Sequence, residues 1–174
     1  MHRARGFTLL EMLVVIGIVG LMVGGAVLSL GLVSGEARLE RELDRLGKRL
    51  TYLRERAELE NRPYGMQIDQ QGYRFMVFDV ARAEWLPLQD DLLTNQNWGN
   101  STEPEIYLEG RRIVLKERLE ATAPPAVGVD ASGEYLEFEI RLRNVDNASV
   151  EFLKPNSHGL LQRGRETAPD GVRR

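Results

Sequence analysis

Residues 6–16 read GFTLLEMLVVI and place a single acidic residue, Glu11, near the start of a long apolar run. The segment before it, MHRAR at residues 1–5, is basic, and residues 12–33 contain no Asp, Glu, Lys or Arg. A helix over that run is roughly 33 Å long, which matches the hydrocarbon core of a bilayer, about 30 Å thick. We therefore predict a membrane-spanning helix with its basic end in the cytoplasm and the rest of the chain outside.

Glu11 bears on whether the apolar segment is kept in the mature protein. One alternative is a secretory signal peptide that is cleaved near residues 24–26, which would discard the segment. The other is cleavage after Gly6, which would retain it. A carboxylate within a membrane helix costs on the order of a few kcal/mol unless it has a partner, and only a retained helix can gain one. The position of Glu11 therefore favours retention.

The stretch from Gly6 to Glu11, with its apolar continuation, closely resembles the processing site of type IV pilins and of the pseudopilins of type II secretion. The resemblance implies that a prepilin peptidase cleaves between Gly6 and Phe7 and that the new amine of Phe7 is N-methylated. It also implies that Glu11 neutralises the Phe7 amine of a neighbouring subunit during assembly. Such a pairing is physically reasonable, because it offsets much of the cost of placing each charge in lipid.

Glycine is frequent in the apolar segment, where Gly20 and Gly24 form a small-xxx-small pair. In membranes such a pair lets a second helix approach closely. The alternative is that glycine is simply common in transmembrane helices. We predict helix packing at these two positions and leave that alternative open.

Beyond residue 35 the helical pattern becomes amphipathic. Apolar residues recur at spacings of three and four and form one stripe: Leu39, Leu43, Leu46, Leu50, Leu53 and Ala57. Such a stripe packs either on the chain's own sheet or in a coiled-coil dimer, and its length of under three heptads favours the sheet. Asn61-Arg62-Pro63 ends the helix, because the residue before proline avoids the helical region. One helix of about 80 Å is therefore predicted over residues 7–60.

The remainder of the chain predicts short strands. They cover residues 64–69, 73–79, 85–88, 106–108, 111–115, 135–143, 150–153 and 159–162. Pro87 indicates an edge position for the third strand. Residues 135–143 alternate, which places Leu136, Phe138, Ile140 and Leu142 on a buried face and Tyr135 on the wet face. Residues 89–104 are predicted to form a long surface loop, and the tail from residue 163 is predicted to be frayed.

These elements predict an α+β fold, in which a long N-terminal helix packs its second half on an antiparallel β-sheet domain. Four segments follow: a leader peptide at residues 1–6, a transmembrane and assembly helix at 7–34, the amphipathic half of the helix at 35–62, and a periplasmic β-rich domain at 63–174. Residues 57–65 and 72–87 resemble the minor pseudopilins of the H type (GspH), which have the pilin-like fold.

Signs of catalysis are scarce. The chain has no cysteine, which excludes disulfides and thiol catalysis, and only two histidines. His2 lies in the predicted leader, and His158 lies in a turn-like segment. Residues 130–134 lack the alternating oxygen ligands of a calcium loop and are predicted to be a turn. We therefore predict no enzymatic activity, no cofactor and no metal site.

Trp98 lies in the polar stretch NQNWGN at residues 95–100. Exposed aromatic residues on polar loops often anchor protein interfaces. The alternative is that the ring folds back and caps the sheet. We predict that the loop over residues 90–104 contacts another subunit or a substrate, with Trp98 as its candidate anchor.

The leading hypothesis for function is a minor pseudopilin, a structural component of the type II secretion pseudopilus that acts in tip assembly and in export of folded proteins across the outer membrane. Its expected partners are other minor and major pseudopilins, the prepilin peptidase and the inner membrane. The alternative is a minor type IV pilin of the FimT kind, in pilus assembly or DNA uptake. Such a role would use the basic C-terminal end, namely Arg163, Arg165, Arg173 and Arg174. A net charge of −3 makes nucleic-acid binding the less favoured role.

Overall fold

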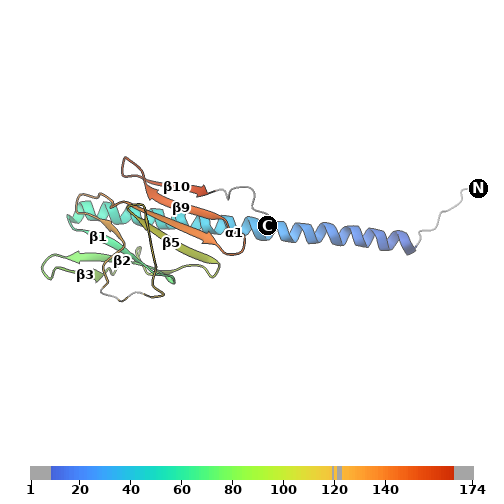
Figure 1. Ribbon diagram of the computed structural model, residues 1–174, viewed down its shortest axis with the longest axis horizontal. Helices are drawn as coiled ribbons and strands as arrows, with labels where there is room; N and C mark the ends of the chain where they lie inside the picture. Colours follow the sequence, from blue (N-terminus) through green and yellow to red (C-terminus); the bar gives the residue numbers. More distant parts are fainter. Residues whose placement is uncertain (1–8, 119, 121–122, 167–174) are drawn as a thin grey trace, which may run out of the picture.

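The computed structural model describes residues 9–118, 120 and 123–166 of the 174-residue chain, without the side chains of residues 23–36. The cleavage site at Gly6 and Phe7 therefore lies outside the described residues. The described part consists of a long helix that carries two antiparallel sheets on one half of its length, while the other half extends beyond them (Figure 1).

The helix α1 (Leu9–Glu60) is continuous, as predicted. All six residues of the predicted stripe between Leu39 and Ala57 are at most 1% exposed. This face packs against strands of both sheets, which confirms the prediction that the stripe covers the chain's own sheet. Since the stripe is already buried within the subunit, it is not available as the seam of a coiled-coil dimer.

The end of α1 is fixed by backbone and side-chain contacts. Asn61 adopts a left-handed conformation with φ of 49°, and the Arg62 amide donates to Ala57 O at 3.2 Å. Glu60 then accepts hydrogen bonds from Arg56 Nε at 2.6 Å and from the Tyr64 hydroxyl at 2.5 Å. These contacts hold the first strand at a set angle to the helix.

The first sheet has the order β3-β2-β1-β7, and the short β4 also pairs with β2. Its strands are β1 (Tyr64–Ile68), β2 (Gly72–Asp79), β3 (Glu84–Pro87), β4 (Gln96–Asn97) and β7 (Val127–Val129). The strand that contains Pro87 lies at the edge, as predicted. Gly72 admits β4, because a Cβ at Gly72 would lie only 2.9 Å from Gln96 C and 3.0 Å from Asn97 Cα.

The second sheet has the order β10-β9-β8-β5-β6. Its strands are β5 (Thr102–Leu108), β6 (Arg111–Ile113), β8 (Phe138–Asn144), β9 (Val150–Pro155) and β10 (Leu161–Glu166). Glu109 and Gly110 join β5 to β6 with positive φ at both positions, 49° and 73°, as a type I′ hairpin turn requires. The core lies between α1 and the inner faces of the two sheets.

Several predictions about the β domain are wrong. The predicted loop over residues 89–104 contains β4 and the start of β5, and β7 was not predicted. The alternating strand starts at Phe138, so Leu136 is 65% exposed rather than buried. Tyr135 instead turns inward, and its hydroxyl donates to Leu50 O at 2.8 Å. The tail is ordered through Glu166, because β10 pairs with β9 along its whole length.

Candidate functional site

The part of α1 that extends beyond the sheets has an apolar surface. Along residues 9–22, which we call the stem, the large apolar side chains are between 46% exposed at Val15 and 88% exposed at Leu9. They lie on all sides of the helix, and a helix that is apolar all round is stable only in apolar surroundings. The stem is therefore the surface of the described molecule with the clearest need for a partner.

Within the part of the chain that the structure describes, no helix carries an apolar stretch long enough to cross a membrane. The predicted transmembrane segment at residues 7–34 includes positions that are not part of that description.

Glu11 lies in the first turn of α1. A carboxylate is favoured there, because the backbone amides at a helix N-terminus carry partial positive charge. Its predicted partner is the Phe7 amine of a neighbouring subunit, and Phe7 lies outside the described residues. At Gly20 a Cβ would meet nothing within 4 Å, so this position is open to another helix, while the surroundings of Gly24 are not described.

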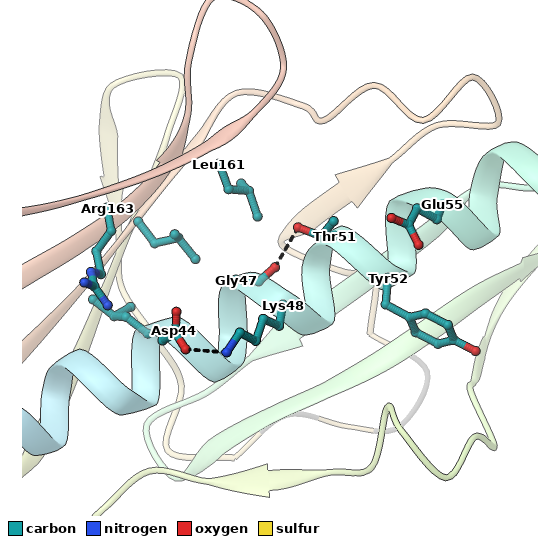
Figure 2. A pocket seen from close by; sticks show the side chains of 10 residues that line it. Asp44, Gly47, Lys48, Thr51, Tyr52, Glu55, Leu161 and Arg163 are labelled. Carbon is teal, nitrogen blue, oxygen red and sulfur yellow. Dashed lines mark hydrogen bonds and ion pairs between the residues drawn. The ribbon is translucent and has the colours of Figure 1, made fainter.

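A groove of about 500 Å³ runs between α1 and strands β9 and β10 (Figure 2). Leu43, Leu153 and Leu161 form its apolar part, and Gly47 leaves its centre free of a side chain. The two cations at its rim are paired, Lys48 with Asp44 at 2.8 Å and Arg163 with Glu40 at 2.8 Å. The Thr51 hydroxyl that lines the groove donates to Gly47 O at 3.0 Å, and the three leucines give the groove a surface on which an apolar side chain could pack.

A second groove, of about 400 Å³, lies on the other flank of the buried stripe of α1. We call it the arginine groove. Its helical side consists of Arg38, Arg41, Glu42, Arg45 and Arg49, and its other side of Tyr73, Gln96, Asn97 and Gly99. None of the side chains on its far side carries a charge at neutral pH, so the arginines dominate its electrostatics.

Glu42 is half-buried inside this groove and accepts hydrogen bonds from the Gly99 amide and, at 3.4 Å, from Thr102 Oγ1. Burial raises the pKa of Glu42 above its ordinary value of 4.5, although these hydrogen bonds and the nearby Arg38 and Arg45 act in the opposite direction. Glu42 therefore holds the loop around Gly99 against α1.

Trp98 folds back onto the domain, so its role as an exposed anchor was the wrong alternative. The side chain is 7% exposed, Nε1 donates to Asp69 O at 3.0 Å, and the ring lies 4.9 Å from the ring of Tyr73. The loop is also fixed at its other end, where Asp90 forms an ion pair with Arg56 and accepts from the Leu93 amide at 3.0 Å. A contact between the loop and a partner stays a prediction.

Two of the four arginines that would serve a nucleic-acid role, Arg163 and Arg165, are described by the structure, and both form ion pairs. Arg163 pairs with Glu40, and Arg165 pairs at 2.8 Å with Glu151, which is only 3% exposed. Arg173 and Arg174 lie outside the described residues. As far as the structure extends, the C-terminal end is therefore not a free basic patch.

The candidate residues for metal or catalytic chemistry lie in turns. The His158 amide donates to Asn156 Oδ1 at 2.9 Å, and Asp130 Oδ1 accepts from the amides of Ser132 and Glu134 at 2.9 Å each. Both segments were predicted to be turns. Among the described residues, no three His, Cys, Asp or Glu side chains come together in a way that could hold a metal ion.

Comparison with known proteins agrees with both the motif and the fold. Residues 1–27 match the family described as the prokaryotic N-terminal methylation motif. The chain is 35% identical over 148 residues to type II secretion system protein H of Pseudomonas aeruginosa, and the aligned region covers 82% of this chain and 84% of the relative. It is 26% identical over 147 residues to the protein of the same name from Escherichia coli K12, over 83% of each chain.

Two solved structures have the same fold. The minor pseudopilin EpsH from the type 2 secretion system of Vibrio cholerae matches with a TM-score of 0.60 and 18% identity, over 72% of this chain and 95% of that one. The solution structure of Escherichia coli GspH matches with a TM-score of 0.53 and 20% identity, over 73% and 86% of the two chains. Together with the 35% identity to the Pseudomonas protein, these findings show that the chain belongs to the family of type II secretion system protein H, the minor pseudopilins of the H type.

Proposed function

We propose that this chain is inserted in the inner membrane, cleaved between Gly6 and Phe7, N-methylated on Phe7, and built into the tip of a periplasmic pseudopilus. The observation that supports this proposal most directly is the stem. Its large apolar side chains are exposed along residues 9–22, and Glu11 is the one charged residue there. A filament core made of such helices would bury this surface.

The stem would have two apolar environments in this cycle, the bilayer before assembly and the bundle of helices after it. Transfer between them leaves little net hydrophobic driving force, because lipid tails are as apolar as leucine side chains. A specific contact must then decide when and in which register the subunit enters. We assign this role to Glu11 and the Phe7 amine of a neighbouring subunit, with close helix contacts at Gly20 and Gly24.

The proposed role is structural rather than catalytic. It is supported by the match of residues 1–27 to the methylation motif and by the family membership of the whole chain. The proposed partners are the prepilin peptidase during maturation and other minor and major pseudopilins during assembly. In the filament the β domain would face the periplasm and act in export of folded proteins.

Glu11→Gln in the full-length protein tests the proposal. The substitution keeps the shape of the side chain and removes its charge, so insertion and cleavage should be unchanged while co-purification with partner pseudopilins falls about tenfold or more, the loss expected for a charged pair in lipid. Glu137→Gln, an exposed position on the β domain, is the matched control and should behave as wild type.

The mature N-terminus gives a second readout of the same experiment. Mass spectrometry should find a chain that starts at methylated Phe7. Normal co-purification of the Glu11→Gln protein, or a mature chain that starts near Val27, would contradict the proposal.

A further inference from the structure

The arginine groove carries a row of cations that the proposed function does not use. Arg38, Arg41, Arg45 and Arg49 follow one another on α1 at spacings of three, four and four residues, so they lie along one side of the helix. From first to last the row is about 17 Å long. It begins four residues beyond the predicted transmembrane segment, which ends at residue 34, and runs beside the domain, parallel to the helix axis.

Most of this charge has no counter-charge within the subunit. Arg38, Arg41 and Arg45 are exposed and form no ion pair with any residue that the structure describes. Arg49 donates to the Tyr73 hydroxyl at 2.8 Å, which is a neutral acceptor. Glu42 is the one carboxylate of the groove. The excess is specific to this flank, because the cations at the rim of the opposite groove are paired.

The walls of the groove suit a polypeptide that carries carboxylates. Guanidinium groups bind carboxylates through two parallel hydrogen bonds. Facing them are the side-chain amides of Gln96 and Asn97. Gln96 Nε2 already donates to Thr94 Oγ1 and Asn95 O, so the Asn97 amide and Gln96 Oε1 are the groups that can bond to peptide groups. An extended segment that lies along α1 would therefore meet cations on one side and amides on the other.

The direction of the row distinguishes such a segment from a lipid surface. The headgroup layer on each side of a bilayer is only about 5–8 Å thick. A row of about 17 Å that runs along the axis of the predicted membrane helix would leave the headgroups after its first arginines. A nucleic acid is disfavoured for another reason, since the chain as a whole carries a net charge of −3.

We propose that the arginine groove binds an extended acidic segment of a neighbouring subunit that runs beside α1. That the segment belongs to another subunit of the filament rests on the proposed function above. The preference for an acidic polypeptide rests on the groove alone. A contact of this kind would fix the rotation of the whole subunit about the axis of α1 in the filament, which a stem that is apolar on all sides leaves open.

The test measures binding of a fluorescently labelled oligoglutamate peptide to the full-length protein in a neutral detergent, by fluorescence anisotropy. Arg45→Glu should weaken binding about tenfold or more, as loss of a charged pair implies. Glu42→Gln should strengthen it, because it removes the one anion of the groove. Arg111→Glu is the control: it makes the same charge change at an exposed arginine on β6 and should leave the affinity unchanged.

Thermal unfolding of each variant checks that the fold is intact. If Arg111→Glu weakens peptide binding as much as Arg45→Glu does, the proposal is overturned, because the attraction would then depend on the net charge of the protein and not on the groove. Tighter binding of a single-stranded DNA oligonucleotide, or of phosphatidylglycerol vesicles, than of the peptide would overturn it as well.

The outcome is separable from that of the Glu11 experiment. If the peptide does not bind while Glu11→Gln still impairs co-purification, the groove proposal fails and the filament proposal stands. If the peptide binds at the groove while Glu11→Gln assembles normally, the filament proposal fails, and the groove remains a site for acidic polypeptides.

Discussion

Trp98 fills the space between β2 and the loop that leads into β5. Its ring packs against the ring of Tyr73, and its Nε1 donates a partly buried hydrogen bond to Asp69 O. Gly72 makes this arrangement possible, because a side chain there would occupy the position of β4. One indole therefore closes the side of the first sheet that the arginine groove borders.

Trp98→Phe should lower the free energy of unfolding by about 1–3 kcal/mol, because the ring is mostly retained but Asp69 O loses its donor. Trp98→Ala should cost about 3–5 kcal/mol, since it also leaves a cavity. Urea unfolding of the full-length protein in detergent measures both. Trp85→Phe, at a half-buried position on the edge strand β3, is the control and should cost less. A smaller effect of Trp98→Phe than of Trp85→Phe would contradict this account.

At the scale of elements, the backbone conformation of Asn61 sets the end of α1. Asn61 leaves the helix with φ of 49°, a conformation that costs most side chains about 1–2 kcal/mol but suits asparagine and glycine. The turn directs the chain into β1, where Tyr64 bonds back to Glu60.

Asn61→Val should therefore lower the free energy of unfolding by about 1–2 kcal/mol or more, whereas Asn61→Gly should leave it within about 0.5 kcal/mol of wild type. Chemical denaturation in the same detergent compares the two. Equal destabilisation by valine and glycine would show that the asparagine side chain, and not the left-handed backbone, matters at this position.

The elements differ in how far the sequence could predict them. The stripe of α1 was predictable, because its spacing repeats over many residues and Pro63 marks its end. The short β4 and β7 were not, since strands of two or three residues exist only through their partners: β4 needs the space at Gly72, and β7 the edge of β1. Leu136 was misplaced because alternation shows a period but not the residue at which a strand begins.

At the scale of the whole molecule, two carboxylates have pKa values that are shifted in opposite directions, Glu105 in the second sheet and Glu42 in the arginine groove. In the second sheet, burial raises the pKa of Glu105, but the hydrogen bond from Arg143 and the charges of Arg112 and Arg143 outweigh it, so the pKa is lowered. In the arginine groove burial prevails, and the pKa of Glu42 is raised. The two groups therefore contribute to stability with opposite dependence on pH.

The direction of each pH dependence follows from the difference between the folded and unfolded pKa values of the group. Glu105 stabilises the fold above its ordinary pKa of 4.5, and this contribution is lost as the pH falls through its lower folded value. Glu42 favours the fold below 4.5, and this contribution is lost as the pH rises through its higher folded value. At neutral pH, Glu105→Gln should therefore lower the midpoint of thermal unfolding and Glu42→Gln should raise it.

Thermal unfolding followed by circular dichroism at neutral pH and at a pH below both folded pKa values tests this pair. Both differences from wild type should shrink at the acidic pH, where the carboxylates of the wild-type protein are protonated. A lower midpoint of Glu42→Gln at neutral pH would show that its charge holds the loop more strongly than burial opposes it.

The candidate site was predictable only where it is local in sequence. The Glu11 motif lies within a few residues and could be recognised directly. The arginine groove could not, because a row of arginines on a helix is usually a solvated face. Its significance comes from Tyr73, Gln96 and Gly99, which the fold brings to α1 from distant positions.

The division of α1 has a consequence for how a subunit would travel. The residues that hold the domain together begin at Leu39, and none of them belongs to the stem. The domain can thus reach its final shape in water while its anchor is still embedded, and lifting the subunit out of the lipid would not disturb it. On the proposed function, the secretion system would move a domain that is already folded, and the work of extraction would be needed only to transfer the apolar helix out of the lipid.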